Sequence, residues 1–333
     1  MRWIHYKRMP GTKLARIKSG LNIYRMTSFK SKAFNFLVRN GHLFQGRLKK
    51  EEFDYNTSIA GFRERCEKGA ARAGKLPEGI AIERVTAEGI AAEWLIPEGA
   101  DRENVVLYVH GGGYVSGSCS DHRGVVSKLA RYTEVTHLLY EYRLAPEHPY
   151  PAALEDSVVV YRWLLASGFK PGNIMMAGES AGGGLCLATL LALKERNLPM
   201  PSAAVVLSPW TDLTCSGDSY RTKNKVSPAP LNSWTVFSRY YAGNHNPADP
   251  LISPLFGDLR GLPPLFINSA ADDELFDDGE RFFLRAKEAG VEVHFRPGMG
   301  MIHCYPLLAP LFREAEEAMN EIAAFVKSHL IKK

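Results

Sequence analysis

The sequence is poor in cysteine and in long apolar runs, and both shortages limit what it can be. Its five cysteines are odd in number and widely spaced, with no C-x-x-C pair, which argues against a disulfide framework or a zinc knuckle. No apolar run reaches the roughly 18 residues of a membrane-spanning helix. Residues 1–30 also lack a continuous apolar stretch of signal-peptide length. We therefore expect a cytoplasmic protein in a reducing compartment.

Acidic residues are absent from the first 50 positions. Residues 1–50 hold 13 of the 41 Lys and Arg residues of the chain and none of its 36 Asp and Glu residues. A basic segment of this kind can bind nucleic acid or an anionic membrane surface. No nucleic-acid-binding motif accompanies the charge, so no nucleic acid is predicted as a partner.

Apolar residues within this basic segment recur at helical spacing. They are Met26, Phe29, Ala33 and Leu37, with Ile23, Phe34 and Val38 nearby and with Arg25, Lys30, Lys32 and Arg39 between them. This pattern predicts an amphipathic helix. The simplest interpretation packs the apolar face on the protein's own body and leaves the charges in water. Weak attachment to a membrane surface is the alternative, since basic amphipathic helices also lie in bilayer interfaces.

From about residue 80 onward, short apolar segments alternate with helical ones. Strands are predicted at 80–85, 90–96, 105–109, 134–140, 174–177, 203–207, 265–268 and 291–295, and helices at 122–132, 151–167, 181–196, 277–289 and 309–329. Such alternation predicts an α/β fold with a mostly parallel sheet covered on both faces. Residues 211–246 interrupt the alternation with prolines and aromatic residues, which favours a lid over the ligand-binding edge of the sheet. A surface excursion without a role is the alternative.

Ser180 lies in Gly178–Gly182, a Gly-x-Ser-x-Gly motif between a predicted strand and a predicted helix. A nucleophile on such a tight turn needs small neighbours two residues away on each side. A glycine-rich packing turn or a phosphate loop would be the alternatives, but no Gly-Lys-Ser/Thr sequence follows. The motif therefore favours Ser180 as a nucleophile.

Three glycines follow His110 at the end of the predicted strand 105–109. Main-chain N–H groups in such a loop can approach a ligand closely and stabilise the oxyanion of an acyl-transfer reaction. A merely flexible turn is the alternative. The pairing with the serine motif favours the first interpretation.

A serine nucleophile needs a base, and the base needs an orienting carboxylate. His303 is the candidate base, because it lies in a glycine-containing loop after the last predicted strand. In folds that carry this serine motif, the acid lies between the serine and the histidine along the chain. The candidates are Asp272, Asp273, Glu274, Asp277 and Asp278, and spacing does not choose among them.

These motifs together resemble the hormone-sensitive-lipase-like branch of the α/β-hydrolases, the bacterial family IV carboxylesterases. The matching segments are 110–114, 142–148, 151–153, 178–183, 249–250, 253–255, 262–264, 273–277 and His303. The resemblance covers about residues 80–330. It implies an α/β-hydrolase fold with a catalytic domain at 76–333, a helical cap segment at 1–75, and a second, inserted cap segment at 211–246.

The resemblance also implies roles for single residues. It makes Ser180 the nucleophile, Asp273 the acid and His303 the base, with the N–H groups of Gly112, Gly113 and Ala181 as oxyanion donors. The sequence departs from the family pattern at Glu274, which replaces a proline, at Glu179, which replaces the commoner aspartate, and at Cys304, which replaces a glycine. The first departure keeps Asp272 and Asp277 open as alternative acids.

The implied function is hydrolysis of short- to medium-chain carboxylic esters through an acyl-enzyme, with no cofactor and no metal. His148 has no second histidine at ligand spacing, which argues against a metal site around it. Two alternatives are an amidase or deacetylase with the same triad, and a non-catalytic binding protein like the plant gibberellin receptors, which lack the base. The expected partner is a small-molecule ester, and a homodimer is left open.

Overall fold

The computed structural model describes residues 27–44, 49–73 and 76–330. Within these ranges, one eight-stranded sheet has the order β1-β2-β4-β3-β5-β6-β7-β8. The strands are β1 (Ile80–Ala87), β2 (Ile90–Pro97), β3 (Val105–Val109), β4 (Thr136–Tyr140), β5 (Ile174–Glu179), β6 (Ala203–Leu207), β7 (Leu265–Ala270) and β8 (Val293–Gly298). β2 runs antiparallel to β1 and β4, and the other pairs are parallel. The predicted α/β class with a mostly parallel sheet is confirmed.

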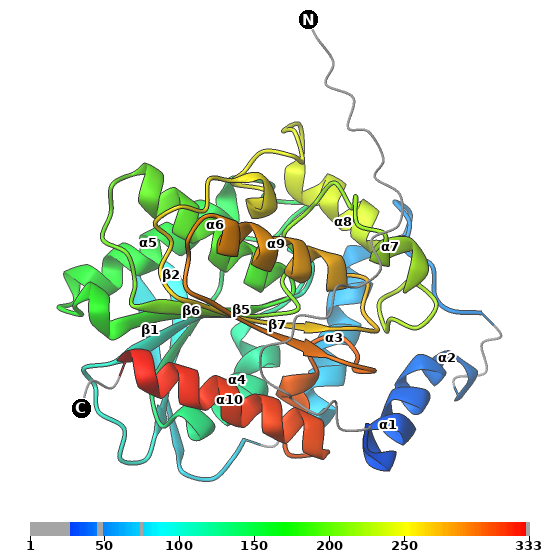
Figure 1. The fold of residues 1–333 in the computed structure, drawn as a ribbon, viewed down its shortest axis with the longest axis horizontal. Helices are drawn as coiled ribbons and strands as arrows, with labels where there is room; N and C mark the ends of the chain where they lie inside the picture. The colour runs from blue at the N-terminus through cyan, green and yellow to red at the C-terminus, as the bar shows by residue number, and fades with distance from the viewer. Residues whose placement is uncertain (1–26, 45–48, 74–75, 331–333) are drawn as a thin grey trace, which may run out of the picture.

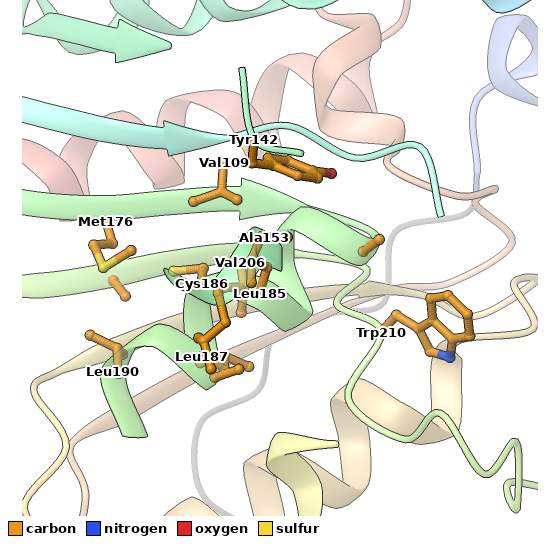
Figure 2. Close-up of a cluster of buried hydrophobic side chains, with 14 of the residues drawn as sticks. Val109, Tyr142, Ala153, Met176, Leu185, Cys186, Leu187, Leu190, Val206 and Trp210 are labelled. Atoms are coloured by element: carbon orange, nitrogen blue, oxygen red, sulfur yellow. The ribbon is translucent and has the colours of Figure 1, made fainter. Parts of the chain in front are cut away.

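Helices cover both faces of this sheet (Figure 1). Those after β3 are α4 (Cys119–Thr133), α5 (Ala152–Ala166), α6 (Ala181–Glu195), α7 (Ser219–Thr222), α8 (Ser233–Ala242), α9 (Phe276–Glu288) and α10 (Arg313–Leu330), with short 3-10 turns at Pro171–Asn173, Pro254–Phe256 and Tyr305–Leu308. α5, α6 and α9 lie on one face, and α4 and α10 on the other. Figure 2 shows α6 residues such as Leu185 and Leu190 packed beside Met176 and Val206 of the strands. Among the helices in the described ranges, none has the length and hydropathy of a membrane span.

Two strands begin two residues later than predicted, because the residues before them belong to the end of the preceding helix. Glu134 closes α4 in the left-handed conformation, with φ 58°, so β4 starts only at Thr136. Val291 donates its N–H to the Ala286 carbonyl at the end of α9, which delays β8 to Val293. Both shifts follow from local backbone hydrogen bonds that periodicity does not report.

The N-terminal part forms α1 (Phe29–Arg39), α2 (Gly41–Phe44) and α3 (Ile59–Ala73). The predicted packing of the apolar face of α1 on the body is wrong for Phe29 and Leu37, which are 85% and 51% exposed, and for exposed Ala33. It holds for Phe34, whose ring packs on Phe312 with centroids 5.8 Å apart. Buried Ser31 and Asn35 also face the body, and Asn35 donates a hydrogen bond to the Gly300 carbonyl. The body offers both polar and apolar partners to α1, so the buried side of the helix includes Ser31 and Asn35 beside Phe34. Ile23, Arg25 and Met26 lie outside the described residues.

The N-terminal part and the insertion at 211–246 pack against each other. Phe53 donates its N–H to the Leu231 carbonyl at 2.8 Å, and Leu231 donates to the Glu51 carbonyl at 2.9 Å. The Phe53 and Phe237 rings meet edge to face, with centroids 4.8 Å apart. Two segments far apart in sequence therefore form one layer above the carboxyl edge of the sheet.

Candidate active site

Ser180 occupies a strained turn between β5 and α6, with φ 58° and ψ −126°. Its N–H donates to the Leu207 carbonyl, and its own carbonyl accepts from the Trp210 N–H, each at 2.9 Å. The turn is therefore held by backbone bonds to the neighbouring strand end. The Ser180 side chain does not cap α6, although the residue stands at the cap position. Its hydroxyl is not engaged by the helix that it precedes.

The glycines around Ser180 are required by close backbone contacts. A Cβ atom on Gly182 would lie 2.2 Å from the Val109 carbonyl oxygen, and one on Gly178 would lie 2.6 Å from the Gly182 carbonyl oxygen. Any side chain at either position would displace α6 from the sheet. This is the physical basis of the motif recognised in the sequence.

The loop after β3 presents main-chain donors beside Ser180. Gly112 and Gly113 have φ values of 112° and 66°, which favour glycine. Within the described ranges, the N–H groups of Gly112, Gly113 and Ala181 donate to no other protein group. A Cβ atom on Gly111 would lie 3.2 Å from the Ser180 Cβ atom, so the loop and the turn are adjacent. The structure thus places the loop that carries Gly112 and Gly113 beside the turn that carries Ala181.

His303 and Asp273 form a hydrogen-bonded pair, with 2.5 Å between Nδ1 and Oδ2. Asp273 is completely buried. Burial alone would lower the pKa of His303, but the charge of Asp273 and the hydrogen bond between them raise this pKa well above its usual value. Asp273 therefore occupies Nδ1 of the ring, and the Cys304 side chain adds to the same rise in the pKa of His303.

The other acidic candidates contact different partners. Asp272 binds Arg39, Glu274 accepts a hydrogen bond from the Trp234 indole, Asp277 accepts from the Ser219 N–H, and Asp278 accepts from the N–H groups of Thr211 and Asp212. Among the five candidates left open by the sequence, the structure pairs Asp273 with the histidine.

The loop that carries His303 meets the serine turn at the end of β6. The Leu207 carbonyl accepts the Ser180 N–H and also lies 3.7 Å from the Cys304 sulfur. The Trp234 ring lies 5.9 Å from the His303 ring, between centroids. The serine turn, the glycine loop and the Asp273–His303 pair therefore gather at one edge of the sheet.

Sequence reasoning missed a buried charge network behind the glycine loop. Glu179 Oε1 accepts the Gly111 N–H at 2.6 Å and lies 2.9 Å from His122 Nε2, while Asp121 binds the other ring nitrogen of His122. Burial would lower the pKa of His122, but the two carboxylates raise it to about 10. The sequence showed Glu179 as a departure from the family pattern, yet nothing in it pointed to His122.

Residues 106–307 match a sequence model whose family is described as alpha/beta hydrolase fold, and this range contains the serine turn, the glycine loop and the Asp273–His303 pair. The chain is therefore an α/β-hydrolase. In the described residues, no cluster of three or more His, Cys, Asp or Glu residues could hold a metal ion.

Individual relatives identify a narrower family within the α/β-hydrolases. An acetyl-hydrolase of Streptomyces hygroscopicus is 40% identical over 248 residues, which cover 73% of this chain and 82% of that protein. The crystal structure of an esterase from the bacterial hormone-sensitive lipase family has a TM-score of 0.83 and 36% identity, covering 92% of this chain and all of that one. A structure of EstE5 soaked with p-nitrophenyl butyrate has the same TM-score and coverage at 35% identity. The chain belongs to the hormone-sensitive-lipase-like family.

Proposed function

We propose that Ser180, His303 and Asp273 form the catalytic triad of this protein, a serine carboxylesterase. The observation that carries the proposal is the 2.5 Å hydrogen bond between His303 and buried Asp273, at the sheet edge that also holds the Ser180 turn. A triad needs a base whose ring is oriented by a buried carboxylate. Asp273 supplies that carboxylate.

In this mechanism His303 Nε2 removes the proton of the Ser180 hydroxyl as the oxygen attacks the ester carbonyl. Asp273 holds the tautomer and stabilises the imidazolium that forms. His303 then protonates the leaving alcohol, and the acyl group stays on Ser180. Water activated by His303 attacks the acyl-enzyme and releases the carboxylic acid.

The charge that develops on the ester oxygen is stabilised by the N–H groups of Gly112, Gly113 and Ala181. Ala181 is the first residue of α6, so its N–H has no partner within the helix and lies at the positive end of the helix dipole. Preorganised donors of this kind are worth about 3 kcal/mol each in transition-state stabilisation.

Residues 1–75 and 211–246 are proposed as a cap over the acyl group, and residues 76–333 as the catalytic domain. A Cβ atom on Gly113 would lie 2.4 Å from the Phe237 ring, so the insertion packs directly on the glycine loop. Aromatic side chains from both segments surround this contact. A cap of this kind favours short- to medium-chain esters, including acetyl esters.

The test is a chain-length series of p-nitrophenyl esters, from acetate to decanoate, hydrolysed by the wild type, Ser180→Ala and the control Ser127→Ala. Ser127 is also fully buried but lies on α4. We expect Ser180→Ala to lose all but a trace of turnover and Ser127→Ala to retain it. Equal activity of Ser180→Ala and the wild type would refute the triad.

Adding p-nitroacetanilide and a measurement of ester binding to this series separates the esterase from the two alternatives. Preference for p-nitroacetanilide over p-nitrophenyl acetate would identify an amidase. Saturable binding of esters without turnover by the wild type would identify a binding protein, which the retained Asp273–His303 pair disfavours. Amide and ester hydrolysis use the same residues, so only substrate preference distinguishes them.

A cytoplasmic location is proposed because all five cysteines are free thiols. A small-molecule ester is the partner that the relatives support. No nucleic acid partner is proposed. The homodimer expected as an alternative is tested by sedimentation velocity, in which a concentration-independent monomer would exclude it.

Contact of the basic N-terminal part with a membrane surface is also proposed, and α1 is the helix that would make this contact.

A further inference from the structure

The outward face of α1 is apolar at its centre and basic at its edges. Phe29, Phe36 and Leu37 are exposed to 85%, 61% and 51%, and exposed Ala33 lies between them on the helix. At 100° per residue, Lys30 and Lys32 project on opposite sides of this apolar strip. We call the strip and its two lysines the α1 outer face. A helix of this pattern suits a boundary between water and an apolar phase.

The inward side of α1 is fixed by specific polar contacts. Ser28 caps the helix and also donates from its hydroxyl to Glu314 at 2.7 Å. Asn35 donates to the Gly300 carbonyl at 2.7 Å, and Arg39 binds Asp272. Rolling the helix to bury Phe29 and Phe36 would break all of these bonds. The outer face is therefore a stable feature of the folded protein.

The contacts place α1 beside the candidate active site. Gly300 belongs to the loop that carries His303, and Asp272 precedes Asp273. In Figure 1, α1 and α2 lie beyond the end of the sheet to which the β7 arrow points, where the candidate site is located. Leu43 of α2 adds a further exposed apolar side chain, at 51%. A surface that docked on α1 would therefore lie near the loops that carry His303 and Asp273.

We propose that the α1 outer face docks this protein on an anionic lipid bilayer. Phe29, Phe36 and Leu37 would enter the headgroup boundary, with Lys30 and Lys32 at the level of the lipid phosphates. Neither lysine forms an ion pair with the part of the chain that the structure describes. The 13 basic and zero acidic residues of positions 1–50 add long-range attraction to the same surface.

The chemistry of the face favours lipid over other partners. In a symmetric pairing of two α1 faces, the lysines would approach one another and repel. A nucleic acid would use the lysines but would leave the exposed phenylalanines in water. The inference rests on the proposed esterase function in one respect: docking would let esters dissolved in the bilayer reach the site without crossing water.

The experiment is co-sedimentation of the full chain with vesicles, in the Ser180→Ala background so that binding is measured without turnover. One vesicle is pure phosphatidylcholine, and the other contains equal parts of phosphatidylcholine and phosphatidylglycerol. Phe29→Ser with Phe36→Ser is compared with the matched pair Phe256→Ser and Leu284→Ser, which are exposed apolar residues on another face. Lys30→Glu with Lys32→Glu forms a third variant. Thermal unfolding checks that each variant is folded.

We expect binding to the anionic vesicles at low salt, with a partition coefficient about tenfold lower for either α1 double variant and unchanged for the matched pair. Absence of sedimentation at low salt would overturn the proposal. If vesicle binding were lost in the lysine variant but kept in the phenylalanine variant, the proposal would also be overturned. The α1 outer face would then bind a polyanion such as nucleic acid. A dimer in sedimentation velocity that the phenylalanine variant dissociates would assign the face to a second copy. None of these outcomes depends on whether the wild type hydrolyses esters.

Discussion

Glu179 and Gly111 are joined by a hydrogen bond of 2.6 Å, from the Gly111 N–H to the glutamate Oε1 atom. Glu179 immediately precedes Ser180, and Gly111 opens the loop of proposed oxyanion donors. The same oxygen lies 2.9 Å from His122 Nε2. One carboxylate therefore connects the nucleophile turn to the glycine loop. Glu179 is a positioning residue in this arrangement, because it holds donors and does not touch the substrate.

Glu179→Gln should lower kcat about tenfold to a hundredfold with little change in KM. The expected loss corresponds to a charged hydrogen bond of about 1.5–3 kcal/mol in the buried network. Glu179→Asp keeps the charge on a shorter side chain and should lie between the wild type and Glu179→Gln. Steady-state kinetics with p-nitrophenyl butyrate measures both.

The matched control for this prediction is Glu93→Gln. Glu93 is equally buried and ion-paired, with its Oε2 atom 2.7 Å from Arg123 Nε, but it lies on β2 away from the glycine loop. Glu93→Gln should lower the free energy of unfolding and leave kcat unchanged. A fall in kcat in both variants would show that Glu179 acts through global stability alone.

The pKa of His122 predicts how stability depends on pH. Its folded-state pKa is raised from 6.5 to about 10, so its contribution is complete below pH 6.5 and is lost as pH rises toward 10. The wild type should therefore lose stability across this window more steeply than His122→Gln, by up to about 1.4 kcal/mol per pH unit. Urea unfolding at pH 7, 8 and 9 measures the slopes, and parallel slopes would contradict the prediction.

Asp273→Asn should reduce kcat by about 10⁴-fold, because the wrong tautomer of His303 is then stabilised. Asp272→Asn provides a control at the adjacent position. Asp272 pairs with Arg39 and is partly exposed, so its loss should change kcat by about twofold or less. If Asp272→Asn were instead the inactive variant, the assignment of the triad acid would be wrong.

Arg63 should matter for stability far more than Arg65 on the same helix. Arg63 donates to the Val115 carbonyl at 2.7 Å and to the Ala145 carbonyl at 3.0 Å, and it also pairs with Glu147. Arg63→Met leaves two acceptors unpaired and should cost about 1–3 kcal/mol.

Arg65 pairs with Glu51 near the surface, so Arg65→Met should cost about 0–1 kcal/mol. Urea denaturation of both variants provides the comparison. Equal costs would show that α3 is not anchored through Arg63.

The sequence predicted the sheet well because its central strands are buried on both faces. β3 and β6 are apolar throughout, so short hydrophobic runs bounded by glycine after β3 and by proline on both sides of β6 were sufficient to locate them. The serine turn and the glycine loop were located for a similar reason, since close backbone contacts at Gly182 leave no other residue type. These features are determined by residues that are close together in the sequence.

Features that depend on distant partners could not be predicted. The orientation of α1 depends on Glu314 and Gly300, which lie more than 260 positions away along the chain. Periodicity gave the helix correctly but assigned its exposed side to the core. Similarly, spacing alone did not choose among the acidic candidates; the family resemblance favoured Asp273, and the structure shows this residue bonded to His303. The catalytic roles of these residues stay predictions until the variants above are measured.

The approach of α6 to β3 at Gly182, where an added methyl group would overlap a carbonyl oxygen, has an evolutionary consequence. A side chain at position 178 or 182 would disrupt this packing, so we expect ester selectivity to change through substitutions in residues 211–246 and not through these two glycines. Directed-evolution libraries should therefore yield altered selectivity from positions 211–246, while clones altered at positions 178 and 182 should be absent from the survivors.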